Sequence, residues 1–190
     1  MATMRASIQV INNALFVKYQ VKNQTASEIY LTNLAVRMDP EKGPVLDPGE
    51  AFVYLEEQEL GVHVTKRMPP PPKRLVRLQP HFVIPLKPGE TFEEALELPL
   101  PLSQNIPYVS ESAAQGEKMI VEFKRVLFSL GYVESSPKIM LEQRNYQGED
   151  VFSLVTAFDA QGNAYPFSVI KEKYLVSDPV EVNVPVIRWK

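Results

Sequence analysis

The chain contains one phrase twice, LDPGEAF at residues 46–52 and LKPGETF at residues 86–92. Each copy has a Pro-Gly pair at its centre. Proline fixes φ at about −65° at the second position of a turn, and glycine accepts the positive φ that a type II turn needs at the third. Both pairs are therefore expected to reverse the chain, and a β-strand is expected after each of them.

The segment after the second Pro-Gly pair alternates apolar and polar residues, which indicates a half-buried strand. The alternative is a helix, because residues 91–94 (TFEE) fit a capping box. Pro99 and Pro101 favour a strand at an edge or near its end, since proline neither continues a helix nor donates to a ladder. The residues of the apolar parity are Phe92, Leu96, Leu98, Leu100 and Leu102.

The same alternation recurs along the chain. It predicts a strand over residues 13–23 (NALFVKYQVKN) and a last strand over 180–186 (VEVNVPV). A change of parity inside one strand predicts β-bulges near residues 32–33 and 124–125. A long polar loop is expected over 103–118. Further strands are expected at 52–55, 60–65, 75–78, 81–86, 138–143, 151–158 and 165–170, the last two joined by a turn at 159–163. The buried residues are expected to include Leu15, Val17, Tyr19, Val21, Phe123, Phe128 and Val182.

Many short strands joined by turns predict a sandwich or a barrel. The expected fold is all-β, an immunoglobulin-like antiparallel β-sandwich that extra C-terminal strands could extend. We expect one domain over residues 1–190. The alternative is a sandwich domain at 1–102 and a second β subdomain at 119–190, joined by a linker at 103–118.

Residues 15–23 (LFVKYQVKN), 27–31 (SEIYL) and 86–91 (LKPGET) carry a resemblance. An alternating strand, a polar loop, a second strand and a later Leu-x-Pro-Gly-Glu turn resemble the immunoglobulin-like or fibronectin-like accessory domains of bacteria. The intracellular proteinase inhibitor family is distantly similar in this way. The resemblance covers about the first hundred residues and implies the sandwich fold, but it implies no functional residue.

Composition bounds the chemistry. The 190 residues carry a formal net charge of −3, which argues against a general nucleic-acid binder. The chain has no cysteine, so disulfides, thiolate catalysis and cysteine-based zinc sites are excluded. Its two histidines, His63 and His81, are interpreted as structural. The carboxylates at 56–59 and 93–94 are interpreted as solvated. No catalytic residue, metal site or cofactor is therefore expected.

The candidate site is the proline-rich segment between the two Pro-Gly phrases. Four consecutive prolines enforce an extended polyproline II rod, and residues 69–74 (PPPPKR) fit a pattern that aromatic grooves bind. Basic residues surround these prolines in an acidic chain. The plainer interpretation is a stiff connection whose charges keep a strand edge soluble. The candidate interaction residues are Lys66, Arg67, Pro69, Pro70, Pro71, Pro72, Lys73, Arg74 and Arg77.

The sequence therefore favours a non-enzymatic protein-interaction or structural module that uses this basic hairpin. The alternative is a small-ligand binder, for a carbohydrate or an anion, with a cleft between sheets. The expected partner is a protein that the sequence does not identify, and a homo-oligomer is left open. No run of about 18 apolar residues occurs, and residues 1–10 lack the apolar core of a signal peptide. A cytoplasmic location without a transmembrane segment is expected.

Overall fold

The computed structural model describes residues 1–39, 41, 43–56, 60–68, 82–104 and 117–189. In these parts of the chain the fold is all-β, with no α-helix and one short 3-10 helix, η3 (Phe167–Val169). The strands are β1 (Ala2–Ile11), β2 (Ala14–Asn23), β3 (Ile29–Asp39), β4 (Gly43–Asp47), β5 (Phe52–Glu56), β6 (Gly61–Lys66), β7 (Phe82–Leu86), β8 (Thr91–Pro99), β9 (Leu102–Ser103), β10 (Lys118–Glu134), β11 (Ile139–Tyr146), β12 (Glu149–Thr156), β13 (Glu172–Val176) and β14 (Val180–Trp189).

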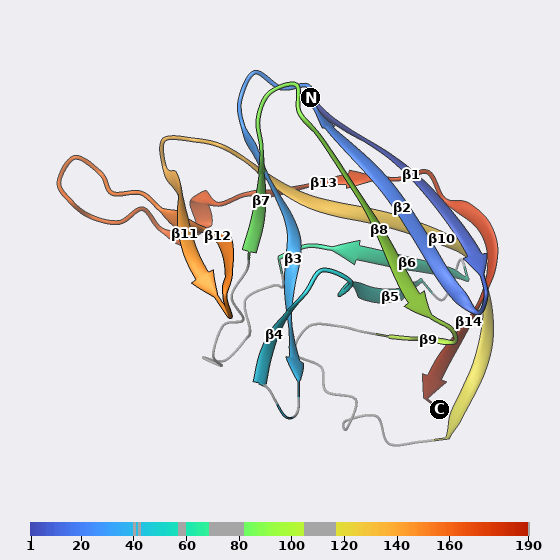
Figure 1. Cartoon of the computed structure of the whole chain (residues 1–190). Helices are drawn as coiled ribbons and strands as arrows, with labels where there is room; N and C mark the ends of the chain where they lie inside the picture. Colours follow the sequence, from blue (N-terminus) through green and yellow to red (C-terminus); the bar gives the residue numbers. More distant parts are fainter. Residues whose placement is uncertain (40, 42, 57–59, 69–81, 105–116, 190) are drawn as a thin grey trace.

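The long strand β10 is the centre of the larger sheet (Figure 1). On one edge it pairs antiparallel with β14 and then with β13. On the other edge it pairs parallel with β6 through residues 125–130 and then antiparallel with β3. This strand therefore brings together segments from both halves of the sequence.

The smaller sheet, in the order β1-β2-β8, lies over β10 and encloses the main core between the two sheets (Figure 1). The alternation of β2 places Leu15, Val17, Tyr19 and Val21 in this core, all at most 1% exposed. The Tyr19 ring packs against Phe128 of β10, with 4.7 Å between ring centroids. Two packed sheets with alternating inward residues form a β-sandwich.

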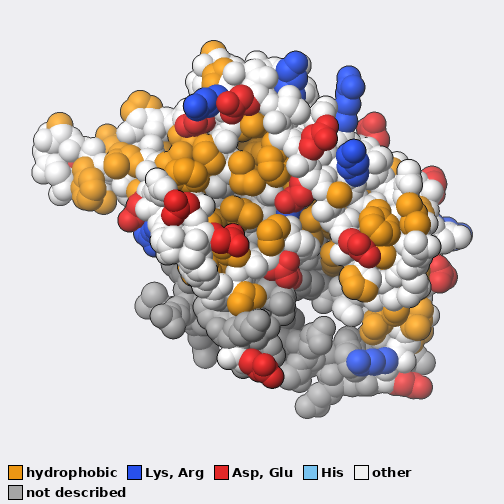
Figure 2. Space-filling model, in the orientation of Figure 1, with side chains coloured by type: hydrophobic (Ala, Val, Ile, Leu, Met, Phe, Trp, Pro, Cys, Tyr) orange, Lys and Arg blue, Asp and Glu red, His pale blue; other side chains and the backbone are white. Residues whose placement is uncertain are grey.

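Beyond β3, the larger sheet continues through β7 and β12 to β11, which is the last described strand on that side. Residues 157–166 form a loop that projects from the end of β12 as an arm (Figure 1). Figure 2 shows hydrophobic side chains on this arm. Phe158 at its base is 66% exposed, and Phe167 in η3 is 62% exposed.

Both Pro-Gly pairs reverse the chain and lead into strands, as the repeated phrase predicts. Glu50 N–H donates to the Asp47 carbonyl and Glu90 N–H donates to the Lys87 carbonyl, each at 3.1 Å. Gly89 has a φ of 82°, whereas Gly49 is not among the glycines with positive φ. The first turn is instead supported by the Asp47 side chain, which accepts the Gly49 N–H at 2.9 Å.

The expected bulges are confirmed. The pairing of β3 with β7 shifts between Leu31 and Leu34, and the pairing of β10 with β14 shifts between Phe123 and Arg125. Each bulge moves the apolar residues back to the core side, so Phe123 and Phe128 are both fully buried. Residues 91–99 form a strand, and the helix alternative is wrong.

Three expectations need correction. The strand expected at 165–170 is absent, because Pro166 precedes the 3-10 turn of η3. The strand expected at 151–158 ends at Thr156, and Phe158 makes only an isolated bridge with Ala164. Val182 lies on the expected face but is only partly buried. The expected strand at 75–78 and most of the expected loop at 103–118 lie outside the described residues.

Candidate interaction surface at the base of the proline-rich segment

The proline-rich segment begins where β6 ends, at Lys66. As a candidate interaction residue Lys66 was expected to be exposed, and this expectation is wrong. Its side chain is 1% exposed, and Nζ lies 2.6 Å from Glu94 Oε2 of β8. The same ammonium donates to the carbonyls of Asn33, at 3.1 Å, and Pro48, at 2.5 Å. Lys66 is therefore a buried link between the two sheets.

Glu94 is the acceptor at the centre of this polar network. It also accepts hydrogen bonds from the Tyr19 hydroxyl and from Asn33 Nδ2, the latter at 3.1 Å. Its side chain is 17% exposed, so the expectation of a solvated carboxylate is wrong for Glu94. Burial lowers the pKa of Lys66, against the opposing effect of Glu94. Burial, followed by the charge of Glu94, raises the pKa of Tyr19.

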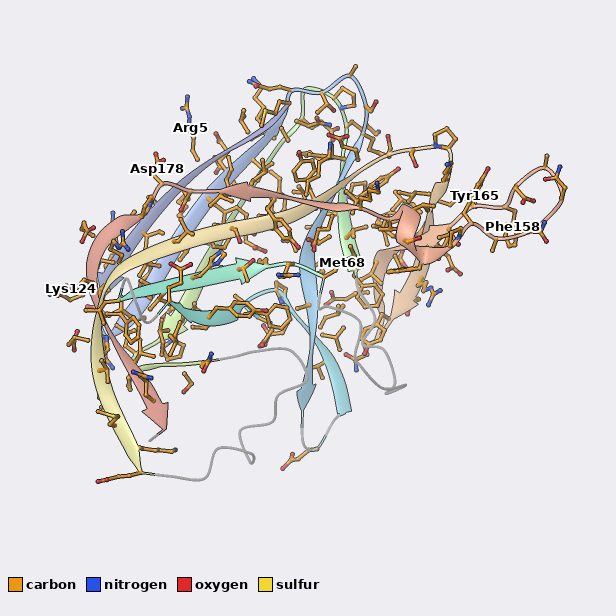
Figure 3. The ribbon with its side chains drawn as sticks, turned by 180° about the vertical axis from the view of Figure 1, so that it is seen from behind. Arg5, Met68, Lys124, Phe158, Tyr165 and Asp178 are labelled. Carbon is orange, nitrogen blue, oxygen red and sulfur yellow. The ribbon has the colours of Figure 1, made fainter. Side chains whose placement is uncertain are left out.

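Glu172 of β13 holds the next residues of the segment in place. One carboxylate oxygen accepts the Met68 N–H at 2.8 Å and the Thr32 hydroxyl at 2.7 Å, and the other accepts the Tyr174 hydroxyl at 2.7 Å. Gly131 of β10 makes room for this carboxylate, because a Cβ there would lie 2.1 Å from Glu172 Oε1 and 2.3 Å from Thr32 Oγ1. Met68 itself packs against the apolar cluster around Tyr30 and Val83. Figure 3 shows Met68 beside the end of β6 and the middle of β3.

Arg67 lies between these anchored residues and reaches the surface. Its guanidinium lies 5.3 Å from the centroid of the Tyr174 ring, in a cation–π contact. Tyr174 is 42% exposed. Burial and the hydrogen bond to Glu172 raise the pKa of Tyr174 to about 12. Tyr174 is therefore a neutral aromatic surface next to a fixed positive charge.

The neighbouring strands extend this surface. Tyr54 of β5 and His63 of β6 are cross-strand neighbours, with ring centroids 6.4 Å apart. Burial raises the pKa of Tyr54, and the charge of Arg67 opposes this effect. Burial lowers the pKa of His63, and the charge of Arg67 acts in the same direction. We call Tyr54, His63, Arg67 and Tyr174 the basal surface of the proline-rich segment. Three of its four side chains are aromatic rings, and Arg67 carries its charge.

His63 was interpreted as structural, and its contacts fit that role. Its Nε2 lies 2.8 Å from Ser129 Oγ, and Ser129 donates to Thr65 Oγ1 at 2.7 Å. Burial, followed in the same direction by Arg67, lowers the pKa of His63, whereas Glu56 raises it. A Ser-His pair also suggests nucleophilic catalysis. Here Ser129 is 2% exposed and donates away from His63, so its oxygen is not presented to a substrate.

The remaining candidate residues lie outside the described parts of the chain: Pro69, Pro70, Pro71, Pro72, Lys73, Arg74 and Arg77, together with His81. Of the nine candidates, the structure thus places Lys66 and Arg67, and separates them into a buried link and a surface residue. Sequence reasoning missed Tyr54, Glu172 and Tyr174. Only the alternation of β13 could have indicated that Tyr174 and Glu172 share a face.

One small hollow lies near this region, with a volume of about 120 Å³, lined by Glu56, Gly61, Val62, Arg125, Leu127 and Pro179. Sites for small organic ligands usually measure about 300–1,000 Å³. The hollow is therefore too small for the cleft that a small-ligand binder needs. Among the described residues, no group of three His, Asp or Glu side chains is arranged to hold a metal ion.

Comparison with protein-family models, with curated proteins and with solved structures gave no match. The described part of the chain contains no helix that is long and apolar enough to span a membrane.

Proposed function

We propose that the protein is a non-catalytic protein-binding module. Its contact surface is the proline-rich segment with its basic residues Lys73, Arg74 and Arg77, together with the basal surface. The observation that carries the proposal is that both ends of the segment are fixed in the larger sheet. Lys66 and Met68 are held by Glu94 and Glu172 at one end, and Phe82, 2% exposed, begins β7 at the other.

Fixed ends and a proline-rich sequence both favour binding. Four prolines restrict φ and lower the conformational entropy that a segment loses when it binds a partner. Arginine and tyrosine are enriched among the residues that dominate binding energies, and Arg67 and Tyr174 lie where the segment begins. The local excess of positive charge favours an acidic protein partner in spite of the net charge of the chain.

The test is recovery of partners from native lysate on the tagged full-length protein. The variant Lys73→Ser/Arg74→Ser should lose most of the recovered partner. Charges that serve only as a contact surface contribute little to stability, so the melting temperature should change by no more than about 1 °C. The matched control is Lys18→Ser/Lys22→Ser, which removes two exposed lysines from β2. It should recover the partner like the wild type.

The salt dependence gives a second readout. Attraction between exposed charges is screened over about 8–10 Å at physiological salt, so recovery by the wild type should fall as salt rises. The proposal fails if the segment variant and the β2 control recover the same proteins in the same amounts. It also fails if Lys73→Ser/Arg74→Ser unfolds the protein, because the segment is then a structural element.

A further inference from the structure

The outer edge of β11 runs over eight residues and pairs with no other strand of the described structure. β11 ends the larger sheet, and its inner edge pairs with β12 along its whole length. The edge of β1, by comparison, lies against β13 and β14. A strand edge presents a row of backbone N–H and C=O groups that can pair with another strand.

The β11–β12 turn determines which residues of β11 bond outward. Gln147 and Gly148 form its two-residue loop, and both have positive φ, at 54° and 90°. The flanking residues Tyr146 and Glu149 are then a hydrogen-bonded pair, and bonding alternates from there along the ladder. The Ala157 N–H donates to the Lys138 carbonyl at 2.9 Å, so Lys138, an even number of residues before Tyr146, also bonds toward the β12 side. The backbone groups of Leu141, Gln143 and Asn145 therefore point to the outer edge.

The side chains of β11 are complementary to a second copy of the same strand. Glu142 and Arg144 lie on one face, are 48% and 50% exposed, and form an ion pair of 2.5 Å within the strand. A two-fold axis at Gln143 places two β11 strands antiparallel, with Glu142 of each strand opposite Arg144 of the other. An axis at Glu142 or at Arg144 instead places like charges opposite each other, which is destabilising.

The same two-fold axis is consistent with the remaining pairs. Gln143 faces its own copy through outward-pointing backbone groups, which gives two backbone hydrogen bonds at the axis. Met140, which is 49% exposed, faces Tyr146 of the second strand on the same side as the charges. Opposite charges and apolar–aromatic contacts are both favourable cross-strand pairs.

We propose that β11 pairs antiparallel with β11 of a second copy of this chain, about a two-fold axis at Gln143, and so joins two larger sheets into one. This homodimer edge is independent of the proposed protein-binding function, because it uses none of the residues of the basal surface. One strand pair buries little area, so the dimer is weak and depends on concentration.

Charge exchange tests the register. Sedimentation equilibrium should show a concentration-dependent dimer for the wild type. Glu142→Arg alone and Arg144→Glu alone each place like charges at the axis, and each should weaken the dimer by about tenfold. The double variant Glu142→Arg/Arg144→Glu restores opposite charges and should dimerise like the wild type. A wild type that stays monomeric, or a double variant that is no better than the single ones, overturns the proposal.

Cross-linking tests the axis directly, because the chain has no cysteine of its own. Residues in a hydrogen-bonded antiparallel pair have Cα atoms about 5.5 Å apart, within the range for a disulfide. Gln143→Cys should therefore give a disulfide-linked dimer under mild oxidation. Asn145→Cys is the matched control, since its copy lies four residues along the strand, roughly 13 Å away. Equal cross-linking of both variants, or of neither, overturns the proposed axis.

Discussion

At the scale of single residues, Lys66 changes the interpretation of the candidate site most, because it is buried and not part of the surface. A lysine at the end of a strand and next to prolines is usually exposed. The alternation of β6 is the one local sign to the contrary, because it places Lys66 on the same face as the buried Val62 and Val64. Its position follows from a contact with Glu94, 28 residues away in the sequence. The buried pair connects the smaller sheet to the start of the proline-rich segment.

We predict that Lys66→Met costs about 3–5 kcal/mol of unfolding free energy, because Glu94 is left charged beside Tyr19 and Asn33. Lys66→Met/Glu94→Leu should cost much less than the sum of the two single changes, since replacing both charges by apolar groups removes the uncompensated charge. Urea unfolding of the four proteins in this double-mutant cycle gives the coupling. If the losses of unfolding free energy in the two single variants add up in the double variant, Lys66 and Glu94 are not energetically coupled.

Phe128 tests the interpretation of the core. It is fully buried and packs against Tyr19. Phe128→Ala should reduce the unfolding free energy by about 3–5 kcal/mol through lost burial and a cavity. Phe167→Ala is the control, because Phe167 is 62% exposed and the change should fall within about 0.5 kcal/mol. A loss below about 1 kcal/mol for Phe128→Ala would contradict the assigned face of β10.

His63 should make stability depend on pH. Its folded-state pKa lies below the ordinary 6.5, mainly because of burial, so the unfolded state binds more protons between these two values. The unfolding free energy should therefore fall as pH drops from about 7.5 through 6.5 toward the folded-state pKa. His63→Gln should remove this part of the dependence. The check is urea unfolding from pH 5 to 7.5. If the unfolding free energies of the wild type and His63→Gln differ by the same amount at every pH, His63 does not cause the pH dependence.

At the scale of elements, Gly131 of β10 leaves room for side chains of β13 and β3. Gly131→Ala should displace the Glu172 carboxylate and cost about 1–3 kcal/mol. The Met68 amide should then exchange its hydrogen faster, because Glu172 is its acceptor. Glu172→Gln keeps an acceptor oxygen of the same shape and should leave the Met68 amide protected. Unchanged exchange in Gly131→Ala would show that Glu172 does not hold the start of the segment.

Much of the element structure could be predicted from the sequence, because alternation and turn residues are local signals. The parity changes at 32–33 and 124–125 were sufficient to predict both bulges. The parallel pairing of β6 with β10 could not be predicted, since it joins residues about 64 positions apart without any local pattern. The basal surface depends on that pairing, because β6 carries His63 and leads into Arg67 while β10 pairs with the strand that carries Tyr174. The basal surface therefore could not be predicted from the sequence either.

At the scale of the whole molecule, the strands before and after residues 105–116 share one core. The main cluster contains Leu15 and Leu96 from the smaller sheet together with Phe128 and Val184 from the larger one. Because β10 pairs with strands from both halves, neither half encloses its apolar residues alone. This arrangement favours one domain over the alternative split at 103–118.

We therefore expect a single cooperative unfolding transition, with equal calorimetric and van't Hoff enthalpies. The fragment 1–102 should show no cooperative transition, because without β10 the inward residues of β2 and β8 lose Phe123 and Phe128 as packing partners. Scanning calorimetry of the full chain and near-UV circular dichroism of the fragment provide the measurements. Two resolved transitions in the full chain, together with a folded fragment, would show that residues 103–118 join two domains that fold independently.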